Sequence, residues 1–393
     1  MQHKPLTGIR VLEFGGYISG PYATSILCSL GADVIKIERP GPGDDFRRGV
    51  DEKSLYFRQY NTGKRSLAVD LKSPEGRALV KALVPSADVV LENLRPGKMS
   101  ALGLGQSDFT ELKPDLVYTS VTGFGSGGTM VARPAYDMIG QSFGGLVATL
   151  SNRDAAQLTG TCLADLITGL STATGILAAL VGRGATGSAQ HLETSITEAV
   201  STLTIDAVTQ LFDSGGTAPT RQSRHPQAQN FCLKTASDDF IVLHLSSSQK
   251  FWESLVAAMA RPELCSDARF STYSDRVEHY FDLARILDGE FMLRPADEWE
   301  KLLIENDVPF APVLSVADYR EHPQVQWLDL FEPENEGLAL TRVPWRFNGE
   351  RPARAADTPR VGEHTLEVAG EVRNEAELQS LLDSGILFTA PTD

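Results

Sequence analysis

The sequence predicts an α/β protein whose centre is a parallel sheet, and three observations lead to that prediction. Short apolar runs rich in β-branched residues alternate with helical stretches along the first 200 residues. The first two runs, 8–14 and 32–38, enclose a glycine turn and a helical stretch, which is typical of a right-handed βαβ unit. The length of 393 residues exceeds that of one usual domain, so we expect two domains or one large domain with an insertion.

The composition is that of a folded protein in a reducing compartment. Hydrophobic residues make up 42% of the chain, enough for a sizeable core. The four cysteines are widely spaced, without CxxC or a histidine at ligand spacing, so we expect reduced thiols and no metal site. The first residues lack the layout of a signal peptide, and the longest uncharged stretch reads as too polar to span a membrane. We therefore expect a cytoplasmic protein without membrane partners.

The charge is unevenly distributed along the chain. The net charge of −15 argues against a nucleic-acid partner. Residues 1–100 nevertheless hold 15 Lys and Arg against 11 Asp and Glu, while the remaining residues hold 21 against 40. The N-terminal part would suit an anionic ligand, and a solvated surface is the alternative explanation.

The first βαβ unit carries a glycine pattern but no dinucleotide fingerprint. Two glycines follow the strand 8–14, Gly-Pro opens a helix over 22–30, and Gly31 ends it before the strand 32–38. The spacing G-G-x-x-x-G-P differs from G-x-G-x-x-G, which weakens an NAD-binding interpretation. Glu38 is followed at once by Arg39, a pair that favours a phosphorylated ribose.

Three further strands are expected at 66–70, 87–92 and 116–120, with a helix over 75–83. Ligands of open parallel sheets bind at the carboxyl ends of the strands. The cations in the loops that follow the strands are therefore candidate phosphate contacts, with solvated surface charges as the alternative. They are Arg39, Lys72, Arg95 and Lys98.

The second half of the chain is less regular. We expect a strand within 187–194 and a long helix over 198–210, followed by a segment rich in Gly, Pro, Ser and Thr that resembles a linker. Beyond it the pattern predicts a strand at 240–245, helices at 249–260, 281–291 and 296–306, a strand or loop at 308–314, a return segment at 326–354 and a helical tail at 369–382.

Asp165 is the one charged side chain in the small-residue stretch 155–182. An ionised carboxylate in apolar surroundings costs several kcal/mol unless it is paired, and no Lys, Arg or His lies within ten residues. Asp165 could be the N-cap of a helix over 166–180 that Gly182 and Gly184 end. It could also be a covalent nucleophile toward an activated acyl group. The two roles are compatible. No P-loop, hydrolase elbow or HExxH motif offers other chemistry.

Five ordered blocks of the sequence closely resemble the family III CoA-transferases, the group of formyl-CoA transferase and carnitine CoA-transferase. The blocks are LTGIRVLEFGGYISGPYATSILCSLGADVIKIERPGPGD, NTGKRSLAVDLK, ADVVLENLRPGKMSALGLG, RPAYDMIGQSFGG and LADLITGLSTATGILAAL. The resemblance implies an α/β fold with a Rossmann-like large domain built from both chain ends, a smaller inserted α/β domain, and an interlocked homodimer. It implies a large domain over 1–200, a linker over 201–225, a small domain over 226–322, a second linker over 323–345 and a return to the large domain over 346–393.

The resemblance also implies a reaction and its residues. Asp165 would be the catalytic aspartate, forming first an anhydride with the acyl group of a donor acyl-CoA and then a thioester with CoA. Coenzyme A would be a substrate and not a tightly bound cofactor, no metal is expected, and the other partner would be a small carboxylic acid. Lys98 is included among the CoA contacts because Ala101 stands where many members have an arginine. The implied contacts are Tyr17, Ile18, Ser19, Arg39, Val69, Asp70, Leu71, Lys72, Asn93, Leu94, Arg95, Lys98, Ala135, Tyr136 and Asp137.

Two alternatives remain at this point. The related α-methylacyl-CoA racemases share the fold but carry a histidine where this chain has Tyr136, and a phenol of ordinary pKa about 10 is a poor base at neutral pH. The other alternative is a non-catalytic CoA-binding or nucleotide-binding subunit in which Asp165 only caps a helix. Short carboxylic or dicarboxylic acids, with succinyl-CoA as donor, are the substrates that the resemblance suggests.

Overall fold

The computed structural model describes residues 4–48, 54–188, 190–354 and 357–390. The chain divides into two compact units. The first comprises 1–147, 156–209 and 329–393, and the second comprises 148–155 and 210–328. Both ends of the chain therefore belong to the first unit, and the middle of the chain forms most of the second.

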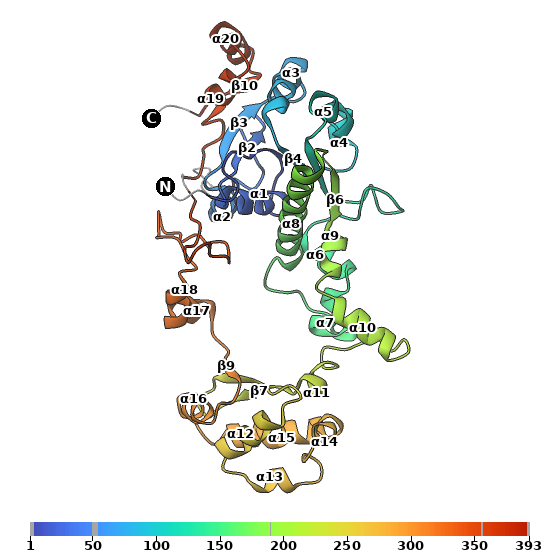
Figure 1. Ribbon diagram of the computed structural model, residues 1–393, viewed down its shortest axis with the longest axis vertical. Helices are drawn as coiled ribbons and strands as arrows, with labels where there is room; N and C mark the ends of the chain where they lie inside the picture. The colour runs from blue at the N-terminus through green and yellow to red at the C-terminus, as the bar shows by residue number, and fades with distance from the viewer. Residues whose placement is uncertain (1–3, 49–53, 189, 355–356, 391–393) are drawn as a thin grey trace. The chain divides into compact units, whose positions relative to one another are not determined.

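A seven-stranded sheet forms the centre of the first unit, in the order β10-β3-β2-β1-β4-β5-β6 (Figure 1). Six neighbouring strands run parallel, and only the short β10 is antiparallel, to β3. The order reverses between β1 and β4, which is where doubly wound sheets leave a crevice for a ligand. The strands are β1 Arg10–Phe14, β2 Asp33–Glu38, β3 Arg65–Val69, β4 Val89–Glu92, β5 Val117–Thr122, β6 His191–Ser195 and β10 Leu387–Phe388. The expected α/β class with a parallel sheet is confirmed.

Helices cover both faces of this sheet. One face packs against α1 Ser19–Ser29 and α8 Leu163–Thr186 through a cluster that includes Val11, Ile26 and Ile176. The other face packs against residues of α3, α5, α19 and α20. The remaining bounds in this unit are α2 Leu55–Asn61, α3 Pro74–Leu83, the 3-10 turn Val84–Ser86, α4 Lys98–Ala101, α5 Gln106–Leu112, α6 Asp137–Phe143, α9 Ile196–Ser201, α19 Thr365–Gly370 and α20 Glu375–Asp383.

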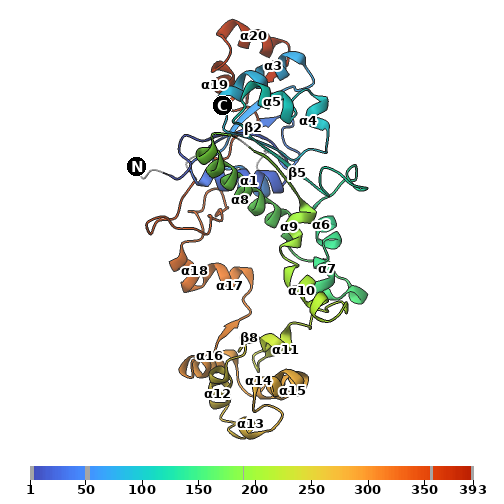
Figure 2. The same cartoon turned by 45° about the vertical axis from the view of Figure 1, so that its right-hand side comes forward.

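The helices α1 and α8 cross closely because α8 has a glycine at the crossing point (Figure 2). A methyl group at Gly169 would lie 2.7 Å from Tyr22 Cδ1 and 2.9 Å from the Ser19 carbonyl oxygen. Since residues four apart lie on the same helix face, Gly169 lies directly below Asp165. The glycine thus lets the start of α1 approach the carboxylate.

The helix α8 differs from the sequence-based expectation at both ends. It starts three residues before the expected 166 and continues past Gly182 and Gly184 to Thr186, where Gly187 with φ of 71° ends it. A glycine inside a helix costs only about 1 kcal/mol, which tertiary packing outweighs. By length and composition alone α8 could cross a membrane, so the expectation that this stretch is too polar was wrong. Its packing against α1, β5, β6 and α9 is that of a core helix.

Other elements also differ from the sequence-based expectation. The long helix expected over 198–210 is two helices, α9 and α10 Ile205–Asp213. The helical tail expected over 369–382 is likewise the pair α19 and α20. The strand β10 was missed because two residues are too short to show an alternating pattern.

The second unit has a three-stranded antiparallel sheet, β7-β8-β9, covered by helices. Its core contains the fully buried Trp252, Phe291 and Trp299. The strand β7 was not expected from the sequence. The bounds here are α7 Leu146–Ser151, the 3-10 turn Arg153–Ala155, α11 His225–Ala228, β7 Asn230–Lys234, β8 Phe240–His244, α12 Gln249–Ala258, α13 Glu263–Ser266, α14 Tyr273–Glu278, α15 Tyr280–Phe291, α16 Ala296–Glu305, β9 Phe310–Pro312, α17 Val316–Glu321 and α18 Pro323–Leu328.

Candidate active site

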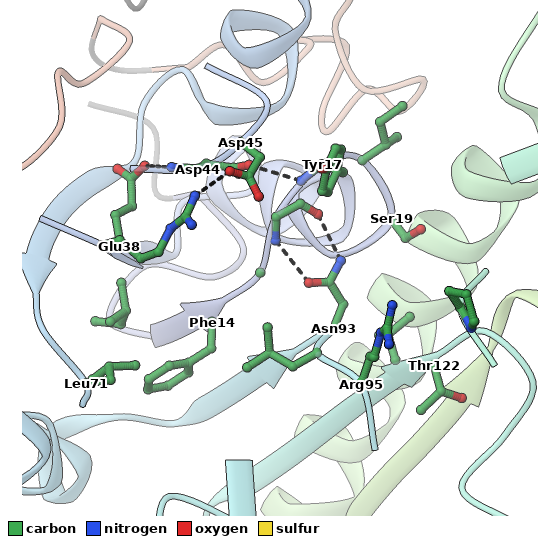
Figure 3. Close-up of a pocket in the computed structure, with 18 of the residues that line it drawn as sticks. Phe14, Tyr17, Ser19, Glu38, Asp44, Asp45, Leu71, Asn93, Arg95 and Thr122 are labelled. Carbon is green, nitrogen blue, oxygen red and sulfur yellow. Dashed lines mark hydrogen bonds and ion pairs between the residues drawn. The ribbon is translucent and has the colours of Figure 1, made fainter. Parts of the chain in front are cut away.

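A cavity of about 890 Å³ lies in the first unit, lined by loops that follow the strands β1 to β5 and by the start of α8 (Figure 3). Most of the residues predicted from the sequence line it. They are Tyr17, Ile18, Ser19, Arg39, Val69, Asp70, Leu71, Lys72, Asn93, Leu94, Arg95, Ala135, Tyr136 and Asp165. Lys98, the first residue of α4, and Asp137, the first residue of α6, are not among the lining residues.

Asp165 is buried at this cavity with only 8% of its surface exposed. The hydroxyl of Ser19, the first residue of α1, donates a hydrogen bond to its Oδ1. Burial raises the pKa of Asp165 to about 6, the Ser19 hydrogen bond opposes that rise, and the charge of Asp137 adds to it. The carboxylate is therefore mostly ionised at neutral pH yet poorly solvated, which is the state that a nucleophile requires.

Asp165 does not cap its own helix. It is the third residue of α8, and the cap position is held by Cys162, whose side chain makes no capping bond. The capping acceptor comes from α6, because Asp137 Oδ1 accepts the backbone N–H groups of Ala164 at 2.9 Å and of Asp165 at 3.1 Å. The carboxylate of Asp165 is consequently left free to face Ser19 and the cavity.

The turn between β1 and α1 brings Ser19 to Asp165. Asn93 at the end of β4 clamps this turn, since its Oδ1 accepts Gly16 N–H at 3.0 Å and its amide donates to Gly16 O at 2.9 Å (Figure 3). A side chain at Gly20 would crowd Asn93, with a Cβ only 3.2 Å from its Cγ. The predicted CoA contact Asn93 is thus already engaged in holding the turn, at the point where the strand order reverses.

Three of the fifteen cations in residues 1–100 are buried in ion pairs with two glutamates. Lys36 and Lys64 each lie 2.7 Å from Glu13, and Arg47 lies 2.7 Å from Glu38, all with side chains at most 2% exposed. Burial opposes the ionisation of Glu13, but the two ammonium groups lower its pKa to about 2. Glu38 lines the cavity, but its carboxylate is engaged with Arg47.

Four cations line the cavity. Arg39 is exposed and bonds to Gly43 O and Asp45, whereas within the described residues no ion pair engages the side chains of Lys72, Arg95 and Arg133. Figure 3 shows Arg95 beside Thr122 in the cavity. Arg133 was not among the contacts predicted from the sequence, although it lies two residues before the predicted contact Ala135.

The cavity offers anion-binding groups at the strand ends and a buried carboxylate beneath the start of α1. Aromatic rings flank it, with Tyr17 and Tyr136 in an edge-to-face arrangement at 5.5 Å. Across the described residues no cluster of His, Cys, Asp and Glu could hold a metal ion. This arrangement can bind an elongated anionic ligand and present one carboxylate to its reactive end.

Comparisons with known proteins agree with this geometry. Residues 6–365 match the model of "CoA-transferase family III". The chain is 31% identical to succinyl-CoA:glutarate CoA-transferase of Mus musculus over 98% of this chain and 90% of that protein. It is 32% identical to acetyl-CoA:oxalate CoA-transferase of Acetobacter aceti over 91% of this chain and 93% of that protein.

A solved structure of similar sequence has the same fold. A CAIB/BAIF family protein from Brucella suis superimposes with a TM-score of 0.81 at 31% identity, covering 95% of this chain and all of that one. The resemblance noted in the sequence is thereby confirmed, and the protein belongs to CoA-transferase family III.

Proposed function

We propose that this protein transfers CoA from an acyl-CoA donor to a small carboxylic acid, with Asp165 as the covalent nucleophile. The observation that carries the proposal is the position of Asp165: a buried, ionisable carboxylate with one hydroxyl partner, lining the cavity of a family III CoA-transferase. A carboxylate held in this way is costly to keep ionised, so a chemical role accounts for it better than a structural one.

The reaction would run through two kinds of acyl-enzyme. A carboxylate oxygen of Asp165 attacks the thioester carbonyl, the C–S bond breaks, and CoA leaves as a thiolate with a mixed anhydride on Asp165. The thiolate then attacks the Asp165 carbonyl carbon, which releases the donor acid and leaves an aspartyl-CoA thioester. The acceptor carboxylate repeats these steps in reverse order and regenerates free Asp165. No net proton transfer is needed.

The start of α1 would stabilise the negative charge that develops on oxygen. The first N–H groups of a helix have no partner within the helix, and α1 begins at Ser19, whose hydroxyl bonds to Asp165. A single such donor contributes about 2.7–4 kcal/mol to an acyl-transfer transition state. Ile18 supplies no side-chain amide, so backbone donors would carry this role.

CoA would lie along the strand ends, with its phosphates near Lys72, Arg95 and Arg133. Each is a cavity-lining cation without an ion-pair partner among the described residues. The acids are proposed to be short dicarboxylic acids, because relatives are named for succinyl-CoA, glutarate and oxalate. We also propose the interlocked homodimer, the inserted small domain and the cytoplasmic location that the resemblance implies.

The test is intact-protein mass spectrometry after incubation with a panel of acyl-CoAs, using hydroxylamine or borohydride to trap activated carboxyls. Wild type is expected to gain the modification on the peptide that carries Asp165, and Asp165→Asn is expected to gain none. An amide side chain cannot form the anhydride. It occupies the same space as the carboxylate, and its oxygen can still accept the hydrogen bond from the Ser19 hydroxyl.

Three outcomes would overturn the proposal. Labelling of Asp165→Asn at the same level would place the nucleophile elsewhere. Absence of labelling by every acyl-CoA, together with exchange of a carbon-2 hydrogen with deuterated solvent, would favour a racemase. Binding of CoA without either reaction would favour a non-catalytic subunit.

A further inference from the structure

The turn Gly15–Ser19 contains Ser19, whose hydroxyl bonds to Asp165. Side chains from two different segments hold this turn by hydrogen bonds. Asn93 holds Gly16 from the side of β4, as described above. From the other side Asp44 Oδ1 accepts the backbone N–H of Tyr17 at 3.3 Å and that of Phe46 at 2.9 Å (Figure 3). Gly16 permits this approach, since a Cβ there would lie 3.3 Å from Asp44 Oδ1.

This turn is not one that the chain adopts without a cost. Tyr17 has φ of 61°, in the left-handed region that non-glycine residues rarely occupy. Such a residue costs about 1–3 kcal/mol and persists only where the surroundings impose it. Because Tyr17 is two residues before Ser19, its conformation sets where the Ser19 hydroxyl points.

A buried ammonium group holds Asp44 in place. Lys36 Nζ lies 2.9 Å from Asp44 Oδ2, 2.8 Å from the Gly15 carbonyl oxygen and 2.7 Å from Glu13 Oε1. The side chains of Lys36 and Glu13 are 0% exposed and that of Asp44 is 2% exposed. Lys36 therefore fixes both Asp44 and the first residue of the turn, away from solvent that could compete.

We propose that Asp44, anchored by Lys36, is a positioning residue for acyl transfer: it imposes the turn that aims Ser19 at Asp165. Asp44 would act on the reaction only through Ser19, and it does not contact Asp165 itself. This inference rests on the proposed function, because it concerns the chemistry of Asp165. The conformational cost at Tyr17 would be met by the buried Lys36–Asp44 pair.

The test is the pH dependence of single-turnover acylation, measured from pH 5 to 9 with the acyl-CoA that labels wild type. The acid side of this profile reports the ionisation of Asp165, which Asp137, Tyr60 and Cys162 also face. Since the Ser19 bond opposes the rise in the pKa of Asp165, Ser19→Ala should move the acid side to higher pH by about one unit. Asp44→Ala should move it in the same direction.

Two comparison variants separate positioning from general damage. Asp88→Ala removes another carboxylate of the same unit that accepts a backbone N–H, from Arg10 at 2.9 Å, and pairs with a cation, Arg183 at 2.8 Å. Asp88 directly precedes β4, so it lies at the amino-terminal ends of the strands, whereas the cavity lies at their carboxyl ends. Its variant should lose stability but keep the wild-type profile. Asp44→Asn keeps an acceptor oxygen for the Tyr17 amide but loses the charge that pairs with Lys36, so its profile should lie between those of Asp44→Ala and wild type.

The double variant Ser19→Ala/Asp44→Ala decides the route of the effect. If Asp44 acts through Ser19, the double variant should have the profile of Ser19→Ala alone. A profile of Asp44→Ala that coincides with that of Asp88→Ala would overturn the inference, as would additive shifts in the double variant. If Asp44→Ala does not fold, Asp44→Ser replaces it. The serine hydroxyl keeps a polar group at this buried position, but its oxygen lies one bond nearer the main chain than the Asp44 carboxylate oxygens. Failure of the proposed function would show separately, as wild type that no acyl-CoA labels.

Discussion

The carboxylate of Asp137 accepts the backbone N–H of Asp165 at 3.1 Å, so one acidic residue holds the main chain of another. The two side chains belong to α6 and α8, which pack together in the first unit. Asp137 thereby caps α8 and at the same time raises the pKa of Asp165 through its negative charge. This arrangement keeps the Asp165 carboxylate available and lets its ionisation be tuned from the neighbouring helix.

Asp137→Asn should separate these two effects. The amide oxygen can still cap α8, but the negative charge is gone, so the pKa of Asp165 should fall. We expect the acid side of the acylation profile to move to lower pH, measured by labelling at fixed time. Asp137→Ala should instead lose the cap and destabilise the fold by about 1–2 kcal/mol in urea unfolding. An unchanged profile in Asp137→Asn would contradict this account.

Asp165→Asn should be more stable than wild type at pH 8. Because the folded pKa of Asp165 is raised to about 6, the folded state binds this proton more tightly than the unfolded state. The ionised carboxylate therefore costs the folded state stability above that pKa. We expect the variant to gain about 1–3 kcal/mol at pH 8, and the gain to shrink as the pH falls from about 6 to about 4. Urea unfolding at both pH values checks it, and equal stability at pH 8 would refute it.

Gly169→Ala should disturb the contact between α1 and α8. The new methyl group would lie 2.7 Å from Tyr22 Cδ1 and 2.9 Å from the Ser19 carbonyl oxygen, so the helices must separate. We expect a loss of about 1–3 kcal/mol and slower acylation, since Ser19 would move from Asp165. The matched control is Gly182→Ala on the same helix, where no atom lies within 4 Å. That variant should gain about 0.5–1 kcal/mol and keep its activity. Equal effects of the two alanines would contradict the model of the crossing.

Arg95→Ala should weaken CoA binding, whereas Lys98→Ala should not. Arg95 lines the cavity without an ion-pair partner in the described part of the chain, while Lys98 lies outside the lining. We expect the Kd for CoA, measured by calorimetry, to be about three- to tenfold higher in Arg95→Ala than in wild type. The difference between the two Kd values should become smaller at high salt. A larger effect of Lys98→Ala would instead support the substitution of Lys98 for an arginine at Ala101.

The order of the first elements follows from local signals. The glycines before and after α1 and Ser73, which caps α3, define where strands end and helices begin, because they act through the backbone within one turn. The parallel sheet then follows from the right-handed βαβ connection. The later elements were harder to predict. The breaks between α9 and α10 and between α19 and α20 depend on tertiary packing, and no local sequence signal indicates them.

The roles of the cations likewise depend on tertiary contacts that the sequence does not show. Lys36, Lys64 and Arg47 contribute to the positive charge of residues 1–100, yet all three are buried in ion pairs with Glu13 or Glu38. Their partners lie up to 51 residues away along the chain, so spacing could not reveal them. Arg133, by contrast, lines the cavity and was not predicted as a contact, although it begins the block RPAYDMIGQSFGG.

By itself the sequence determined the α/β class, the edge of the sheet where the cavity lies, and the one carboxylate of the small-residue helix. These depend on periodicity, on chain direction and on the rarity of a charge in a small-residue helix. Only the tertiary structure decided that Asp137 caps α8, that Ser19 bonds to Asp165, and that Lys36 anchors Asp44. Each of these contacts joins segments far apart in the chain. They form because a buried polar group must find a partner wherever the folded backbone brings one within reach.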